Sequence, residues 1–213
     1  ERMGLTVLLV LQLCLAVGEG VMVPDDPFDF FTQKYVISTP KQWKRVEAMA
    51  QTLDFHNLTI VPAVPMADVS AVVGDSTTVS VRPFIYDRYP ELWPPPSGRQ
   101  NFTEQIFDMR SGEVAVKLSQ ETCLEMFLRS EGRAALIMED DFAPRSDLQQ
   151  LRHRLGMGLR RLPPDWDMVY LGRCYARCDM EKPVGDGLGG LFTSTRSFCL
   201  HAYGVSREGA RRL

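Results

Sequence analysis

The pattern of apolar and polar positions in the first third of the chain predicts a β-α-β unit. Residues 34–38 and 58–64 are short apolar runs rich in β-branched side chains, which is typical of buried strands. Between them, residues 42–53 carry an apolar stripe at helical spacing, which consists of Trp43, Val46, Met49, Ala50 and Leu53. A strand, a helix and a second strand in this order favour a parallel, right-handed α/β layer.

The pattern weakens in the middle of the chain and then becomes regular again. Residues 65–110 contain several prolines, and we expect a long surface insertion there with one short strand at 78–81. The later elements are predicted to be a helix at 114–127, a strand at 134–138, a helix at 147–162 capped by Asp147, strands at 167–171 and 198–205, and a last helix capped by Ser206. The apolar stripe of the first of these helices consists of Val114, Leu118, Leu124 and Phe127.

The N-terminal residues have the form of a secretory signal. Residues 5–17 are apolar apart from Thr6 and Gln12, and small residues follow at the spacing of a cleavage site. The run is shorter than the roughly 20 residues that span a bilayer. We expect a signal peptide at 1–20, or a short signal anchor that would give the only membrane contact, and then a linker at 21–33. A buried apolar helix is the alternative.

Residues 34–213 then form a single α/β domain, for which this length is sufficient. The last residues have the pattern of a helix that breaks off in mid-turn, so we expect the domain to be incomplete at its C-terminus. The formal net charge of −3 and the lack of a basic stretch argue against a nucleic-acid partner.

Two triplets and the cysteine count agree with an oxidising, secretory compartment. Asn57-Leu-Thr59 and Asn101-Phe-Thr103 match the acceptor pattern for N-glycosylation. Apart from Cys14 in the signal, an even number of cysteines remains. The chain would therefore reside in the lumen of the endoplasmic reticulum or Golgi, or be secreted.

The four remaining cysteines predict disulfide bonding in the C-terminal third. We expect one or two disulfides that join the Cys174/Cys178 loop to Cys199. A zinc half-site at Cys174 and Cys178 is the alternative, but the nearby Cys199 and His201 match no common zinc spacing. Cys123 falls on the apolar side of its helix and is expected to be buried.

Three consecutive acids, Glu139, Asp140 and Asp141, end the strand at 134–138. Like charges at the end of a buried strand need either solvent or a cation. Residues two apart in an extended segment point to the same side, so Glu139 and Asp141 would face one cation while Asp140 turns away or reaches a ribose. Carboxylates suit Mg²⁺ or Mn²⁺. The alternative is an acidic turn in solvent that holds no cation.

The order of several segments resembles the family 25 glycosyltransferases, which include lipopolysaccharide and procollagen galactosyltransferases. The stretches that carry the resemblance are Tyr35–Arg45, Gly112–Gln120, Ala135–Pro144 with its EDD acids, Asp165–Gly172 and His201–Ala210. They are spread over residues 34–213, which is nearly all of the chain after the predicted signal. The resemblance implies a GT-A-like nucleotide-sugar-binding domain with a mostly parallel central sheet.

The resemblance also implies an activity and a set of site residues. The activity would be metal-dependent, inverting transfer of galactose or glucose from a UDP-sugar to a hydroxyl of a protein or glycan acceptor, with Mn²⁺ or Mg²⁺ as the ion. Glu139 and Asp141 would bind the metal. The donor would be bound by Lys41, Arg45, Ser119, Gln120, Asp140 and His201. The general base is not identifiable from the sequence.

One departure from the family pattern bears on activity. Gln120 stands where the similar segment of the family has histidine after Leu-Ser, and Ala115-Val116 replaces its Gly-Cys pair. A catalytically inactive relative is therefore an alternative, as is a secreted, disulfide-stabilised binding domain. The three acids lack the spacing and the glycine of an EF-hand calcium loop. A two-metal nuclease or phosphatase would need more acids or histidines.

Overall fold

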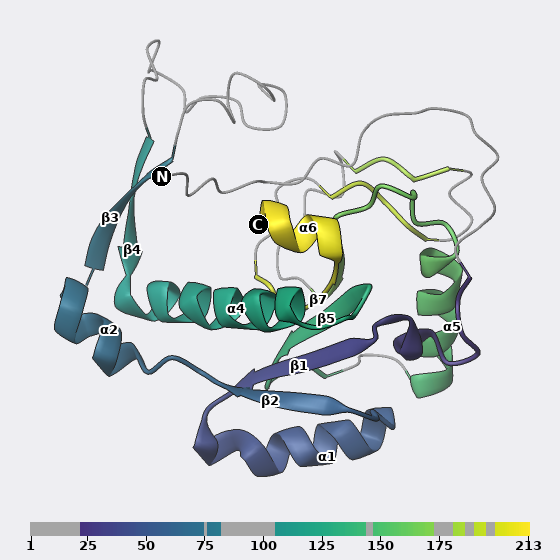
Figure 1. Cartoon of the computed structure of the whole chain (residues 1–213), viewed down its shortest axis with the longest axis horizontal. Coiled ribbons are helices and arrows are strands. Elements are labelled where there is room, and N and C mark those ends of the chain that lie inside the picture. The colour runs from purple at the N-terminus through teal and green to yellow at the C-terminus, as the bar shows by residue number, and fades with distance from the viewer. Residues whose placement is uncertain are drawn as a thin grey trace.

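Five strands form one mixed sheet at the centre of the protein (Figure 1). The computed structural model describes residues 22–74, 76–81, 105–143, 147–172, 181–185, 190–194 and 199–213. The strand order in the sheet is β2-β1-β5-β7-β6. The strands are β1 (Gln33–Ser38), β2 (Leu58–Pro62), β5 (Ala134–Glu139), β6 (Met168–Gly172) and β7 (Ala202–Ser206). Each overlaps a strand that the sequence predicts, and β7 is shorter than expected.

The sheet is mostly parallel, as the sequence predicts. β1 pairs with both β2 and β5 in parallel, and helix α1 (Trp43–Leu53) connects β1 to β2, so the predicted β-α-β unit is confirmed. β7 is antiparallel to both of its neighbours, β5 and β6. This reversed strand leaves the other four running in one direction. The arrangement is the mixed α/β fold expected of a GT-A-like domain.

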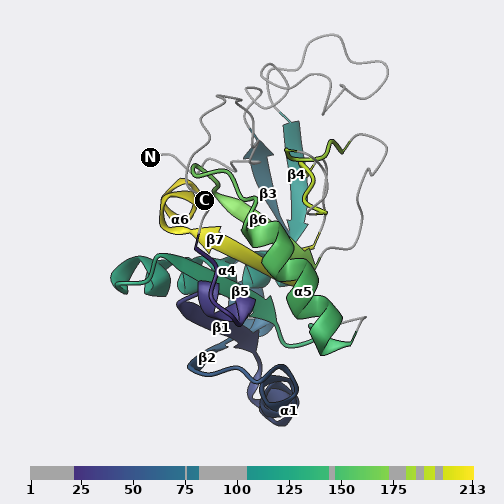
Figure 2. The same ribbon diagram turned by 90° about the vertical axis from the view of Figure 1, so that its right-hand side faces the viewer.

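Helices cover both faces of the sheet. α1 and α5 (Leu148–Leu159) pack on the core that contains Val36, Leu136 and Met138. α4 (Ser111–Arg129) and α6 (Arg207–Arg212) pack on the opposite core, which contains the alternate strand residues. Figure 2 shows α4 and α6 on one side of the sheet and α5 on the other. Because both faces are buried, β1 and β5 are apolar runs rather than alternating ones.

The segment before β1 contributes to the core. The short 3₁₀ helix η1 (Pro27–Phe30) is capped by Asp26, whose carboxylate accepts the Phe28 N–H. Phe28 and Phe31 are buried among residues of α1 and α5. Part of the stretch that we expect from the sequence to be a linker is therefore packed against the domain. The predicted signal at 1–20 lies outside the described residues.

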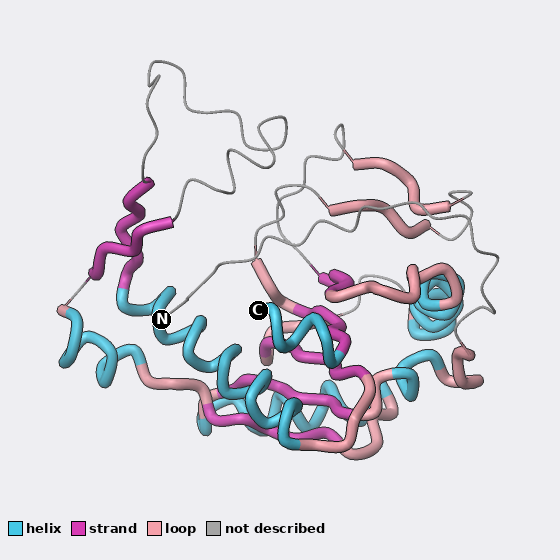
Figure 3. The backbone as a smooth tube through the Cα atoms, turned by 45° about the horizontal axis from the view of Figure 1, so that its top comes forward, coloured by secondary structure: helices cyan, strands magenta, loops and turns pink. Residues whose placement is uncertain are grey.

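The region 65–110 contains more regular structure than its sequence suggests. Helix α2 (Met66–Val73) follows Pro65, and strands β3 (Ser76–Val81) and β4 (Gln105–Arg110) form an antiparallel pair set apart from the main sheet (Figure 3). The strand expected at 78–81 is part of β3, whereas α2 and β4 are not predicted. α2 has eight residues and its N-cap makes no side-chain hydrogen bond, so it lacks the usual sequence marks of a helix start.

In two helices the buried stripe departs from the predicted one at single positions. In α4, Leu118 is exposed, while Ser119 and Gln120 are buried with Cys123. In α1, Trp43 is largely exposed although its spacing assigns it to the buried stripe. It occupies the first position of the helix, where few neighbouring residues can cover a large ring. The predicted caps at Asp147 and Ser206 are confirmed, because both side chains accept a backbone N–H.

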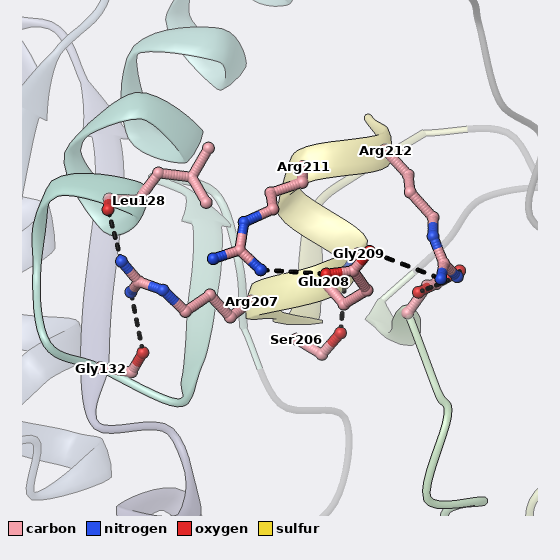
Figure 4. Close-up of polar contacts among 9 residues, drawn as sticks. Leu128, Gly132, Ser206, Arg207, Glu208, Gly209, Arg211 and Arg212 are labelled. Carbon is pink, nitrogen blue, oxygen red and sulfur yellow. Dashed lines mark hydrogen bonds and ion pairs between the residues drawn. The ribbon is translucent and has the colours of Figure 1, made fainter.

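The short helix α6 ties the end of the chain to α4 and β6 (Figure 4). The Arg207 guanidinium donates to the carbonyl oxygens of Leu128, Ser130 and Gly132, at 2.6, 2.7 and 3.2 Å. Arg212 donates to both carboxylate oxygens of Asp167, at 2.9 and 2.8 Å. The bond to Leu128 satisfies a carbonyl in the last turn of α4, which lacks a partner within its own helix, and the other two bonds reach the loop that follows α4.

Candidate functional site

The three acids lie at the carboxyl end of the central strand of the sheet. Glu139 is the last residue of β5, and a turn closed by the Phe142 N–H on the Glu139 carbonyl oxygen (3.1 Å) carries Asp140 and Asp141. β1 and β2 end at the same edge because they run parallel to β5. Ligands of open α/β sheets bind at this edge. The fold therefore places the acids where a ligand site is expected.

Glu139 and Asp141 face the same side and meet His201 there. His201 Nδ1 lies 2.8 Å from Glu139 Oε2 and 3.4 Å from Asp141 Oδ1. One ligand atom from each of the three residues falls within 4.8 Å of the other two. His201 precedes β7, and its carbonyl oxygen accepts the Glu139 N–H at 2.9 Å. The structure thus brings together the two predicted metal ligands and one residue predicted to bind the donor.

Asp140 turns to a different set of partners. Its Oδ2 accepts a hydrogen bond from the Ser38 hydroxyl at 2.8 Å, and its Oδ1 lies 4.0 Å from Arg45 Nη2. Ser38 is the last residue of β1, and only 1% of its surface is exposed. Asp140 therefore joins the ends of β1 and β5, while the acids on either side of it face His201.

A cavity of about 380 Å³ opens next to the acids. Its walls come from the ends of β1 and β5, the residues after β2, and the first half of α4. The lining residues are Ile37, Ser38, Thr39, Ala63, Val64, Pro65, Met66, Gly112, Ala115, Val116, Ser119, Gln120, Glu139, Asp140 and Asp141. One side of the cavity is therefore apolar and the other is polar and acidic. This combination suits a ligand with a flat or apolar part and a part that carries oxygen atoms.

Ser119 lines the cavity, but its hydroxyl is already used in the fold. Its Oγ accepts the Val64 N–H at 2.9 Å and donates to the Ala115 carbonyl oxygen at 2.8 Å. These bonds fix α4 to the segment that follows β2. The residue therefore shapes the wall of the cavity, and its hydroxyl proton is engaged within the protein.

Gln120 lies in the same cavity wall, and its side chain is buried in the core. Its Oε1 accepts the Tyr203 hydroxyl at 2.8 Å, and 5% of the residue is exposed. Burial raises the pKa of Tyr203 well above the ordinary value of 10.0, so the phenol stays protonated and remains a donor. The Gln120 Nε2 has no hydrogen-bond partner within the described part of the chain. A carboxamide does not titrate near neutral pH, so this side chain cannot serve as a general acid or base.

The two basic residues predicted to approach the donor lie outside the cavity wall. Lys41 is exposed in the 3₁₀ helix η2 (Pro40–Gln42), and Arg45 is exposed in the first turn of α1. Arg45 reaches the site through Asp140, at the 4.0 Å distance given above. The residues that the sequence does not single out are Ser38 and Tyr203. Both could have been noted as polar groups in strands that end at, or start from, this edge.

The cysteines agree with the prediction as far as they are described. Cys199 is disulfide-bonded, and its predicted partners Cys174 and Cys178 lie outside the described residues. Cys123 is free and buried, and desolvation raises the pKa of its thiol to about 12. Among the described residues, no helix has both the length and the apolar character that crossing a membrane requires.

Comparison with known proteins supports the family resemblance found in the sequence. No protein-family model matches the chain. A human protein named "Inactive glycosyltransferase 25 family member 3" is 29% identical over 184 residues, which is 86% of this chain and 28% of that protein. A rat protein named "Probable inactive glycosyltransferase 25 family member 3" is 29% identical over 68% of this chain and 24% of its own length. A mouse protein with the same name as the human one is 30% identical over 49% of this chain. The chain thus spans about a quarter of the length of these relatives.

Proposed function

We propose that the chain, which resembles proteins named as glycosyltransferase 25 family members, is a glycosyltransferase-like domain that binds a UDP-sugar with a divalent cation but does not transfer the sugar. The observation that carries the binding half is the convergence of Glu139, Asp141 and His201 beside the cavity. Two carboxylates and an imidazole form a donor set that fits Mn²⁺ or Mg²⁺. A bound cation would offset the charge of a diphosphate group.

The proposal that transfer does not occur rests on Gln120 and on the names of the relatives. Three relatives carry "inactive" in their names. In this chain, Gln120 replaces the histidine of the similar family segment, and its side-chain oxygen is bound to the Tyr203 hydroxyl. A titratable ring is thereby exchanged for a carboxamide that is fixed in the core. Gln120 therefore cannot be the proton acceptor that hexose transfer, which the resemblance alone implies, would need.

We also propose that the domain resides in the lumen of the secretory pathway. The disulfide at Cys199 supports an oxidising compartment. Asn57, the first residue of an acceptor triplet, is exposed in the turn between α1 and β2, where a glycan would meet no part of the core. The second triplet, at Asn101, lies outside the described residues.

Calorimetric titration of the full chain with UDP, UDP-galactose and UDP-glucose tests the binding half. We expect binding in Mn²⁺ that is abolished by chelator, and at least about a tenfold weaker affinity in Asp141→Asn, because a metal ligand is lost. Asp54→Asn is the matched control. Asp54 is an exposed acid remote from the cavity, its φ is 53°, and asparagine tolerates that conformation.

Release of UDP from each donor, measured with protein and glycan acceptors present, tests the proposal that the domain does not transfer the sugar. We expect no turnover above a protein-free blank. Turnover that disappears in Asp141→Asn would overturn the proposal of an inactive domain and restore hexose transfer. A folded chain that binds none of the three nucleotides in Mn²⁺ would overturn the proposed donor site.

A further inference from the structure

We infer that His201 is itself a ligand of the cation, and that its imidazole makes the site select Mn²⁺ or Zn²⁺ over Mg²⁺. The inference rests on the cation site of the proposed function, but it concerns a residue that the family's acidic motif does not contain. It starts from the way the sheet positions the side chain. In the β5–β7 ladder Met138 pairs with Ala202, so the next residue of β5, Glu139, stands opposite His201.

Residues directly opposite in an antiparallel pair carry their side chains on the same face of the sheet, with Cβ atoms about 4.5–5.5 Å apart. The backbone bond from the Glu139 N–H to the His201 carbonyl oxygen extends this pairing to the residue that precedes β7. The His201 ring therefore reaches Glu139 because of the register of the sheet. A chance contact between two mobile surface side chains would not have this support.

The two distances from His201 Nδ1 to the carboxylate oxygens fit a single ion, and all three ligand atoms lie within 4.8 Å of one another. Neighbouring ligand atoms around an octahedral ion with bonds near 2.1 Å stand about 3 Å apart. His201 Nδ1 is 2.8 Å from Glu139 Oε2 and 3.4 Å from Asp141 Oδ1, so both separations lie close to that value. His201 Nδ1 and Glu139 Oε2 are already within hydrogen-bond distance of each other.

The kind of ligand decides the choice of ion. Carboxylate oxygens serve Mg²⁺, Ca²⁺ and Mn²⁺ alike, whereas imidazole nitrogen suits transition ions and Zn²⁺. Mg²⁺ also gives up its bound water molecules reluctantly, so it gains little from a nitrogen ligand. Adding His201 to Glu139 and Asp141 therefore shifts a site that tolerates many cations toward Mn²⁺ and Zn²⁺.

The competing role for His201 is to orient Glu139 through a hydrogen bond. A glutamine in its place can still donate such a bond, but its amide is a poor substitute for an imidazole nitrogen. His201→Gln therefore separates the two roles. His153→Gln is the matched control, because His153 is exposed on α5 and lies against a different surface hollow.

The experiment measures the affinity of the full chain for Mn²⁺, Zn²⁺ and Mg²⁺ alone, and records the spin-echo modulation of bound Mn²⁺ by nitrogen. We expect nitrogen modulation in the wild type and in His153→Gln, and its loss in His201→Gln. Changes to outer partners of metal ligands typically weaken metal binding by about 10–100-fold, so removal of a direct ligand should weaken Mn²⁺ and Zn²⁺ binding by at least tenfold. Mg²⁺ binding should change by much less.

Three outcomes would overturn the inference. They are bound Mn²⁺ without nitrogen modulation in the wild type, an equal loss of Mn²⁺ and Mg²⁺ affinity in His201→Gln, and a folded wild type that binds none of the ions. If the variant fails to fold, the wild-type modulation decides alone. Nucleotide binding separates this inference from the proposed function. UDP binding without nitrogen modulation would contradict only the role of His201 as a ligand. Nitrogen modulation without UDP binding would contradict only the proposed donor site.

Discussion

At the scale of the residue, Gly209 shows how closely α6 approaches Asp167, the residue that precedes β6. A Cβ built at this position would lie 2.2 Å from the Asp167 carbonyl oxygen and 2.8 Å from the Asp167 Cα. That carbonyl oxygen also accepts the Ser206 N–H at 2.9 Å, so it cannot move away freely. The helix can dock here only because residue 209 has no side chain.

We predict that Gly209→Ala destabilises the domain by about 2–3 kcal/mol, since a rigid backbone contact must be relieved. Gly112→Ala is the control, because Gly112 lies in the first turn of α4 and its added Cβ would meet only the Met66 sulfur, at 3.6 Å. There alanine should be neutral, or stabilising by up to about 1 kcal/mol. Urea unfolding of both variants measures the difference, and equal stabilities would contradict the predicted clash.

At the scale of the element, α6 acts as a cap for the much longer α4. Arg207 reaches across to carbonyls at the C-terminal end of α4 and in the loop that leads to β5 (Figure 4). Arg211, four residues later, is exposed and pairs only with Glu208 among the contacts described, at 3.0 Å. The two arginines therefore have the same chemistry and very different surroundings.

We predict that Arg207→Ala lowers the free energy of unfolding by about 2–3 kcal/mol, because hydrogen bonds from a charged donor are lost and the carbonyls keep no replacement. Arg211→Ala should change it by less than about 0.5 kcal/mol, as expected for an exposed ion pair. Chemical denaturation with matched arginine variants measures both values. A loss of similar size in the two variants would refute the capping role.

The sequence predicts those elements whose own residues contain the signal. The apolar runs of β1 and β5 and the caps at Asp147 and Ser206 are local patterns, and the structure confirms them. In α4 the local pattern is misleading, because its buried stripe includes Ser119 and Gln120. Their polar atoms bond to Val64 and Tyr203, which lie far away in the sequence.

The same limit applies to the candidate site. Strand alternation predicts that Glu139 and Asp141 share a side, and they do, although Asp141 lies in the turn after β5 and not in an extended segment. The bond between Ser38 and Asp140 joins residues 102 positions apart, and no local pattern marks it. His201 is expected near the donor, but its contact with Glu139 depends on the antiparallel pairing of β7, which the spacing of strands does not reveal.

At the scale of the whole molecule, one of the two cores contains three buried groups that can lose a proton, a thiol and two phenols. Cys123, Tyr35 and Tyr203 all lie in the core between the sheet and α4. Burial raises the pKa of each group, that of Cys123 from 9.0 to about 12. The folded protein therefore holds these protons more tightly than the unfolded chain does.

The sign of the linkage predicts alkaline instability. These groups are neutral in both states below their unfolded pKa values, so below about pH 8.5 they impose no pH dependence. Above it the unfolded chain loses protons that the folded protein retains, and stability falls as pH rises toward the folded pKa values. Each group contributes a slope of about 1.4 kcal/mol per pH unit within its window, which for Cys123 runs from 9.0 to about 12.

We predict that Cys123→Ala removes one such slope. The stability difference between the wild type and the variant should be constant from pH 7 to 8.5 and should shift steadily in favour of the variant from pH 9 to 11. Denaturant unfolding without reductant, followed on a timescale shorter than exchange between the unfolded Cys123 thiolate and the Cys199 disulfide, measures that difference at each pH. A difference that stays constant up to pH 11 would show that the Cys123 thiol ionises as readily in the folded protein as in the unfolded chain. In that case the core between the sheet and α4 would be open to water, and the buried wall formed by Gln120 and Tyr203 would have to be reconsidered with it.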